Sequence, residues 1–322
     1  MSFIARLMPD RVTVWTRFAA WLNLVLNILI VATGGLVRLT GSGLGCPTWP
    51  MCTDESLVPT SEMGVHGVIE FGNRTLTGAL AIAALLVFLA VINTRGSGLG
   101  LVGPAVWIGS LVVVQAVIGG ITVLVDLDPR VVGVHFLFSV SLAGICALLL
   151  QRVRLNEPLP AAGAASADRL LWASLMAVAV LTWITEIVGV LTTGAGPHAG
   201  DTAAARNGLD PQVMQHVHSW PGYALAVALL VLLVLLFRSG SARSRSLGVS
   251  LTLLVIVQIA VGVYQSRMGL PIWSVAVHMV LAVVAVAVLT VLIVNVRRDG
   301  AAKRSGDGER RPDSGARVPV GA

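Results

Sequence analysis

The residues best suited to chemistry in this sequence are histidines that stand beside or within long apolar segments. There are six, namely His66, His135, His198, His216, His218 and His278. Ionisable groups inside membrane helices are costly and usually mark a functional site. Imidazole binds heme iron, and helix bundles present such ligands from facing helices. The histidines therefore indicate metal or heme chemistry within a helical membrane protein.

Two of these histidines occupy equivalent places in an internal repeat. Residues 115–150 align without gaps on residues 258–293, which places His135 on His278 and a glutamine on a glutamine. Matches between Val and Leu are expected in apolar sequence, so the polar matches are the informative ones. A repeat implies similar structural units. We therefore expect each half of the chain to present an imidazole at the start of an apolar helix.

A partner for His278 is expected in the apolar segment that contains MQHVHSWPGYAL. Its two histidines, His216 and His218, are two positions apart, which is about 200° around a helix, so only one can face inward. Aligning the Ala-Leu pair that follows in each half places His218 opposite Asn73 of the first half. We therefore favour His218 as the ligand and interpret His216 as an interfacial group.

The equivalent segment of the first half, GVHGVIEFGNRTLTGAL, carries three polar groups at a spacing of four. His66, Glu70 and Arg74 share one face of a continuous helix. That face offers an iron ligand, a carboxylate for proton chemistry and a guanidinium able to hold a propionate bidentately. The alternative is a structural Glu70–Arg74 pair beside a surface histidine. A second acidic residue, Glu186, is equally consistent with helix packing and with function.

A cysteine pair lies in the predicted outer loop, which spans roughly residues 39–65. Cys46 and Cys52 are separated by a turn-forming segment with two prolines and a tryptophan. Thiols outside the membrane oxidise and stay oxidised, so we predict a Cys46–Cys52 disulfide that rigidifies a lid over the outer face. Two free, unrelated thiols are the alternative. Cys146, deep in an apolar segment, is interpreted as a small apolar filler.

The composition is that of a membrane protein. Hydrophobic residues make up 56% of the 322 residues and charged residues 12%, against about a quarter charged in soluble domains. Apolar runs of about 20 residues, long enough to cross a bilayer as helix, occur eight times. They lie at roughly 18–38, 70–92, 104–124, 132–150, 171–191, 214–237, 247–265 and 273–296. We predict an all-α polytopic membrane protein with eight transmembrane helices arranged as two pseudo-symmetric four-helix bundles.

The positive charge orients the chain and does not indicate a nucleic-acid partner. Of the 22 Lys and Arg residues, 17 fall in segments predicted to be inside. This positive-inside bias places both termini in the cytoplasm and the histidines toward the outer face. The first residues lack the apolar core and cleavage site of a secretory signal, so a bacterial plasma membrane is the expected location.

The chain divides into two helical halves and three connecting or terminal segments. Residues 297–322 are basic, polar and poor in apolar groups, so we expect a disordered tail that contacts inner-leaflet lipid. The predicted segments are a cytoplasmic arm (1–17), the first four-helix half (18–150), a cytoplasmic linker (151–170), the second half (171–296) and that tail.

These features together resemble the heme A synthase family of membrane enzymes, over about residues 18–296. The resemblance consists of eight helices in two repeats, a Gly-Ser-Gly outer loop ending in CPTWPMC, and histidines near the outer ends of the even-numbered helices. The cysteine loop followed by Glu70 and Arg74 is its specific part. In the family the lid cysteines act on the substrate side, and the resemblance carries this to Cys46 and Cys52.

The resemblance implies two heme sites. One half holds a resident heme b between His218 and His278. The other half binds the substrate heme through His135 and a second histidine, with Glu70 nearby. This chain departs from the family pattern Glu-x-x-His-Arg.

Asn73 stands where the pattern has histidine, and Ser219 stands where it would place arginine after His218. His66, one turn before Glu70, is the candidate replacement for the missing ligand.

The implied activity is oxidation of the C8 methyl of heme O to the formyl group of heme A, by successive hydroxylations with water as the oxygen source. Glu70 is the candidate general base, since a carboxylate in a low-dielectric cleft can accept protons near neutral pH. The implied partners are heme O, a heme O synthase, cytochrome oxidase assembly factors and an electron acceptor, with homo-oligomer formation left open. The alternatives are a di-heme b electron carrier linked to quinone, and a transporter with histidine proton relays.

Overall fold

The structure of the protein is a computed structural model that describes residues 7–158 and 168–309, and the regular secondary structure of this part is entirely helical. The long helices are α2 (Val14–Leu39), α3 (Gly64–Val91), α4 (Val102–Leu124), α5 (Pro129–Leu155), α6 (Arg169–Ala195), α7 (Pro211–Ser239), α8 (Ala242–Arg267) and α9 (Ile272–Glu309), with short 3-10 helices η1 (Ser61–Met63) and η2 (Ile92–Ser97). All eight long helices are long and apolar enough to cross a membrane. The prediction of an all-α protein with eight spans is confirmed.

Local sequence signals set where the histidine-bearing helices begin. Asp128 caps α5 and Asp210 caps α7, each by accepting a hydrogen bond from the backbone N–H two residues later. A proline occupies the first helical position in both cases, where its missing N–H costs nothing. These starts place His135 and His218 roughly two turns inside their helices.

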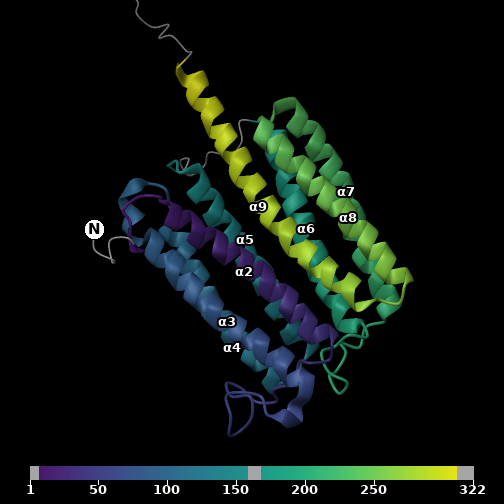
Figure 1. Cartoon of the computed structure of the whole chain (residues 1–322). Helices are drawn as coiled ribbons and strands as arrows, with labels where there is room; N and C mark the ends of the chain where they lie inside the picture. The colour runs from purple at the N-terminus through teal and green to yellow at the C-terminus, as the bar shows by residue number, and fades with distance from the viewer. Residues whose placement is uncertain (1–6, 159–167, 310–322) are drawn as a thin grey trace, which may run out of the picture.

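The eight helices pack as two groups of four, α2 to α5 and α6 to α9 (Figure 1). Within each group consecutive helices are in contact, and the first helix contacts the fourth. Helix α9 also packs against α2 and α5, so it joins the groups. The predicted division into halves and a pseudo-symmetric relation between the two groups stay predictions.

The surface of this bundle suits lipid rather than water. Large apolar side chains face outward, for example Trp107 at 63% and Leu230 at 58% exposure. Inside, polar side chains find helix partners: the Asn23 amide donates to the Ala83 carbonyl at 2.7 Å and so links α2 to α3. Such bonds satisfy polar groups that lipid cannot.

Helix α9 continues where a disordered tail was predicted, so that prediction is wrong for residues 297–309. The cause is side-chain anchoring that composition does not reveal. Asp299 accepts a hydrogen bond from Ser244 at 2.7 Å, and Lys303 donates to a carbonyl at the end of α7 at 2.6 Å. The rest of the predicted tail lies outside the described residues, as do 1–6 of the N-terminal arm and 159–167 of the linker.

Candidate functional site

The six histidines lie toward one end of the bundle, where α3, α5, α7 and α9 begin. We call this the disulfide end, because the loop of residues 40–60 that lies there contains the Cys46–Cys52 disulfide. Five of the histidines lie within the first turns of these helices or just beyond them. His198 lies in the loop between α6 and α7, where its Nε2 is 3.0 Å from the Leu270 carbonyl.

A cavity of about 660 Å³ lies between the helices, lined by side chains of both groups. Its volume is in the range of small-molecule and cofactor pockets. His135 lines it from the first group, and His218 and His278 line it from the second. Three of the four predicted iron ligands therefore face one internal space.

His218 and His278 approach each other across this space. Their ring centroids are 6.3 Å apart, with an interplanar angle of 77°. An imidazole nitrogen binds a first-row metal at about 2 Å and the ring centre lies about 1 Å further, so rings on opposite sides of one ion are about 6 Å apart. The pair thus has the spacing of two ligands to a single ion. His216 also lines the cavity, but its side chain is exposed.

His135, His218 and His278 each pack against a glycine of the preceding helix. A Cβ added at these glycines would lie 2.9–3.4 Å from the imidazole Cε1, closer than an ordinary carbon–carbon contact. Glycine therefore permits each ring to lie directly against the neighbouring backbone. The pairs are Gly119 with His135, Gly189 with His218, and Gly262 with His278.

The Nδ1 atoms of His135, His218 and His278 are buried without a hydrogen-bond partner in the described part of the chain. The backbone of Thr185 approaches His218 and that of Gln258 approaches His278, but neither contact has hydrogen-bond geometry. Buried polar atoms without partners are uncommon and call for an explanation. A metal-binding imidazole usually donates its other ring N–H to a carbonyl, a carboxylate or water, and the backbones of Thr185 and Gln258 approach two of these rings.

His66 was predicted to bind iron, but it does not line this cavity. Its side chain is exposed, and its Nδ1 is 2.8 Å from Ser42 Oγ. Helix α3 does contain His66, Glu70 and Arg74 on one face, but this face meets the loop at the disulfide end. The residues of α3 that line the cavity are Asn73, Thr77 and Leu80.

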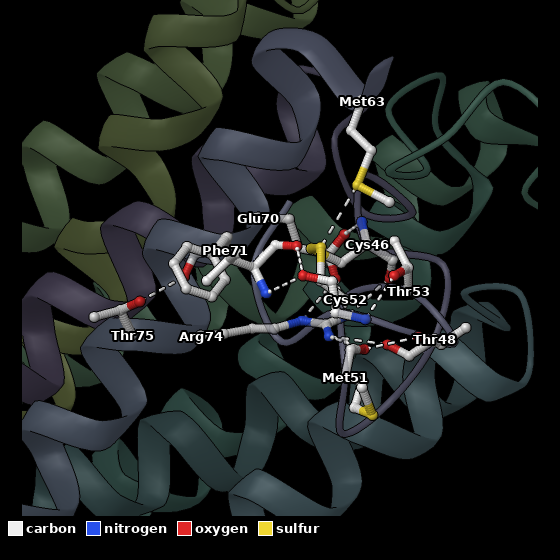
Figure 2. Close-up of a disulfide and its surroundings, with 12 residues drawn as sticks. Cys46, Thr48, Met51, Cys52, Thr53, Met63, Glu70, Phe71, Arg74 and Thr75 are labelled. Carbon is white, nitrogen blue, oxygen red and sulfur yellow. Dashed lines mark hydrogen bonds and ion pairs between the residues drawn. A yellow bond between two sulfur atoms is a disulfide. The ribbon is translucent and has the colours of Figure 1, made fainter. Parts of the chain in front are cut away.

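The predicted disulfide is present, and Glu70 accepts a hydrogen bond from the backbone of its loop (Figure 2). Cys46 and Cys52 have a Cα–Cα distance of 4.4 Å. The backbone N–H of Cys46 donates to Glu70 Oε2 at 2.7 Å, and Glu70 is 5% exposed. The carboxylate predicted to act in proton chemistry therefore holds the disulfide loop and is not among the residues that line the cavity.

Arg74 completes this arrangement with all of its donors. It bonds Glu70 Oε1 through Nε at 3.1 Å and Nη2 at 2.6 Å, and it donates to the carbonyls of Cys46, Thr48 and Met51 at 2.8–3.1 Å. A guanidinium has five N–H donors, so none is left for a propionate. The predicted role of Arg74 as a propionate contact stays a prediction, and in this arrangement it would require the loss of one of these bonds.

Two charged residues that line the cavity were underrated in the sequence, Arg38 and Glu186. Arg38 donates through Nε to the His198 carbonyl at 2.7 Å and through Nη2 to the Thr193 carbonyl at 2.9 Å, and has no carboxylate partner among the described residues. Glu186 is the one carboxylate that lines the cavity in the described part, and it makes no hydrogen bond there. Their signal in the sequence is a charge within an apolar segment.

Comparison with known proteins agrees with this picture. The profile of the COX15-CtaA family, cytochrome oxidase assembly protein, matches residues 17–292. The chain is 31% identical over 159 residues to heme A synthase from Geobacillus thermodenitrificans, covering 47% of this chain and 48% of that protein. It is 29% identical over 148 residues to heme A synthase from Shewanella oneidensis, covering 41% and 44%.

A shorter similarity, 37% over 87 residues, extends to protoheme IX farnesyltransferase from Thermus thermophilus and covers 26% of this chain and 14% of that protein. The matched segments thus span less than half the length of these relatives.

Proposed function

Since this chain belongs to the COX15-CtaA family of cytochrome oxidase assembly proteins and is a multi-pass membrane protein, we propose that it is a heme A synthase. In this role it oxidises the C8 methyl of heme O to the formyl group of heme A. The observation that carries the proposal is the His218–His278 pair, whose ring centroids are 6.3 Å apart on a cavity that His135 also lines.

The two helix groups bind different hemes in this proposal. His218 and His278 hold a resident heme b from α7 and α9, and His135 binds the iron of the substrate heme O in the first group. A bis-histidine heme supplies one-electron transfer when it is bound. The glycine contacts support this assignment, because they let the three rings lie against the neighbouring helices on the cavity.

Proton acceptance falls to a carboxylate. Conversion of a methyl and a water molecule to a formyl group releases protons and electrons in equal number, so a nearby base assists each step. Glu70, the candidate from family resemblance, has both oxygens engaged by Arg74 and the Cys46 N–H. Glu186 lines the cavity without a hydrogen bond in the described part. In this proposal Glu70 holds the disulfide loop. Glu186 is the candidate proton acceptor that lines the cavity, and Glu70 is kept as the second candidate.

Arg38 is the proposed propionate contact in place of Arg74. It lines the cavity at the disulfide end, and neutral carbonyls take two of its nitrogens. A buried guanidinium without a carboxylate partner is stabilised by an anionic ligand. The propionates of a heme supply such anions, so the porphyrin edge is expected to face this end.

The disulfide end faces the outside of a bacterial plasma membrane in this proposal, because a disulfide persists in an oxidising compartment and the basic segments orient the opposite end inward. Both termini are then cytoplasmic. The proposed substrate, heme O, implies a heme O synthase as the partner that delivers it. An electron acceptor and cytochrome oxidase assembly factors complete the proposed partners.

Expression in a host that makes heme O but no heme A tests the proposal. Extracted pigments are separated by chromatography, and heme A is expected only when the chain is present. A protein that binds heme b and leaves heme O unchanged would be an electron carrier. A colourless purified protein would instead favour a transporter, and either result would overturn the proposed synthase.

A further inference from the structure

The first helix group differs from the second at the position across from its cavity histidine. Asn73 of α3 faces Gly34 of α2, with its Oδ1 3.9 Å from a Cβ placed there, as His218 of α7 faces Gly189 of α6. Two turns further along, both α3 and α7 place a buried leucine on the cavity. The equivalent register of the two helices is thus visible in their contacts, and asparagine replaces histidine.

Asn73 is unsuited to bind iron. The only atom of its side chain that could act as a ligand is Oδ1, which lies 2.8 Å from Thr33 Oγ1, and carbonyl oxygen suits Mg²⁺, Ca²⁺ or Mn²⁺ whereas imidazole suits iron. The remaining amide nitrogen is a donor and has no lone pair to offer. His66, the other candidate, lies at Ser42 outside the cavity.

We propose that the first helix group holds its porphyrin iron through His135 alone, with the sixth coordination position open beside Asn73. This inference rests on the proposed function, because it assumes that heme O occupies this group. The Asn73 amide, which lies against Thr33 and lines the cavity, is a polar group available to a small ligand at the open position. The second group, with His218 and His278, has no open position by the same reasoning.

The difference assigns a chemical role to each site. Iron held by two imidazoles exchanges electrons and takes no further ligand. Iron held by one imidazole admits a small molecule such as water to the open position, where a donor can orient it. The helix group in which heme O is oxidised is therefore the group with asparagine.

Carbon monoxide tests the proposal, because it binds ferrous heme with an open position and not a stable bis-histidine heme. Full-length protein in detergent is loaded with excess iron protoporphyrin IX, reduced, and exposed to carbon monoxide. The wild type is expected to show two populations, of which one shifts its Soret band. The shifting population is lost in His135→Ala and retained in His218→Ala.

Asn73→His supplies the missing ligand, so it is expected to abolish the carbon monoxide shift and leave all heme low-spin. Asn73→Ala is the matched control, because it removes the asparagine without adding a ligand, and the shift is retained. His66→Ala leaves the spectrum unchanged. The unaltered band of the second site reports folding in each variant.

A wild type in which carbon monoxide shifts no His135-dependent heme would overturn the proposal. So would a shift that first emerges in His66→Ala, since His66 would then be the sixth ligand. The conversion of heme O to heme A is measured separately. Carbon monoxide binding without heme A formation would contradict the proposed function alone, and heme A formation without carbon monoxide binding would contradict this inference alone.

Discussion

An alanine at position 189 would place a methyl group directly against the His218 ring. The added Cβ would lie 2.9 Å from Cε1 and 3.4 Å from Nδ1. Carbon atoms in contact settle at about 3.5–4.0 Å, so the ring must retreat by roughly 0.5–1 Å. Metal–ligand distances tolerate only about 0.2 Å. Gly189→Ala should therefore weaken the bond between His218 and the heme iron.

The size of the effect follows from the cost of overpacking. Inserting a methyl group into a packed interior costs about 1–3 kcal/mol, and each 1.4 kcal/mol is about tenfold in affinity. Heme b affinity should fall by roughly 5- to 150-fold, with part of the low-spin spectrum converted to high-spin.

Titration of the detergent-purified protein with heme b, followed by absorbance, measures both quantities. Gly109→Ala is the control, because Gly109 of α4 does not line the cavity and a Cβ there meets nothing within 4 Å. Its affinity should equal that of the wild type. Wild-type affinity and an unchanged low-spin spectrum in Gly189→Ala would refute the placement of His218 as an iron ligand.

Four further substitutions test the lid and the cavity charges. Arg74→Met leaves Glu70 buried without its cation, which should cost about 3–5 kcal/mol and expose the loop of residues 40–60 to limited proteolysis. Glu186→Gln should lower heme A formation at least tenfold with heme binding retained, as judged by chromatography and absorbance, and an unchanged rate would exclude Glu186 as the base. Glu70→Gln separates a role in holding the loop from a role as the base. If the loop stays protected from proteolysis while heme A formation stops, Glu70 is the base. Arg38→Gln should lower heme affinity about tenfold or more through loss of a charge-assisted bond, and an unchanged affinity would place the propionates elsewhere.

The sequence predicted most successfully what depends on local pattern. Apolar runs located all eight helices, and the Asp-Pro pairs before α5 and α7 explain where two of them begin. Helical spacing and the internal repeat selected His218 over His216, and the structure brings the ring of His218 to 6.3 Å from that of His278.

What the sequence could not predict depends on which surface a helical face meets. The spacing of His66, Glu70 and Arg74 correctly places them on one face, but periodicity does not reveal that this face meets the disulfide loop. The path of that loop is irregular, so the carbonyls that occupy Arg74 have no sequence signal. The extension of α9 escaped prediction similarly, because it depends on distant partners such as Ser244.

The heme content of single histidine variants tests the central claim most directly. Protein purified from membranes is assayed for bound heme b and its low-spin spectrum. His218→Ala and His278→Ala are each expected to lose the low-spin heme of the second helix group, whereas His216→Ala retains it. A His218→Ala protein that keeps the Cys46–Cys52 disulfide and still holds a low-spin heme dependent on His278 would contradict the account.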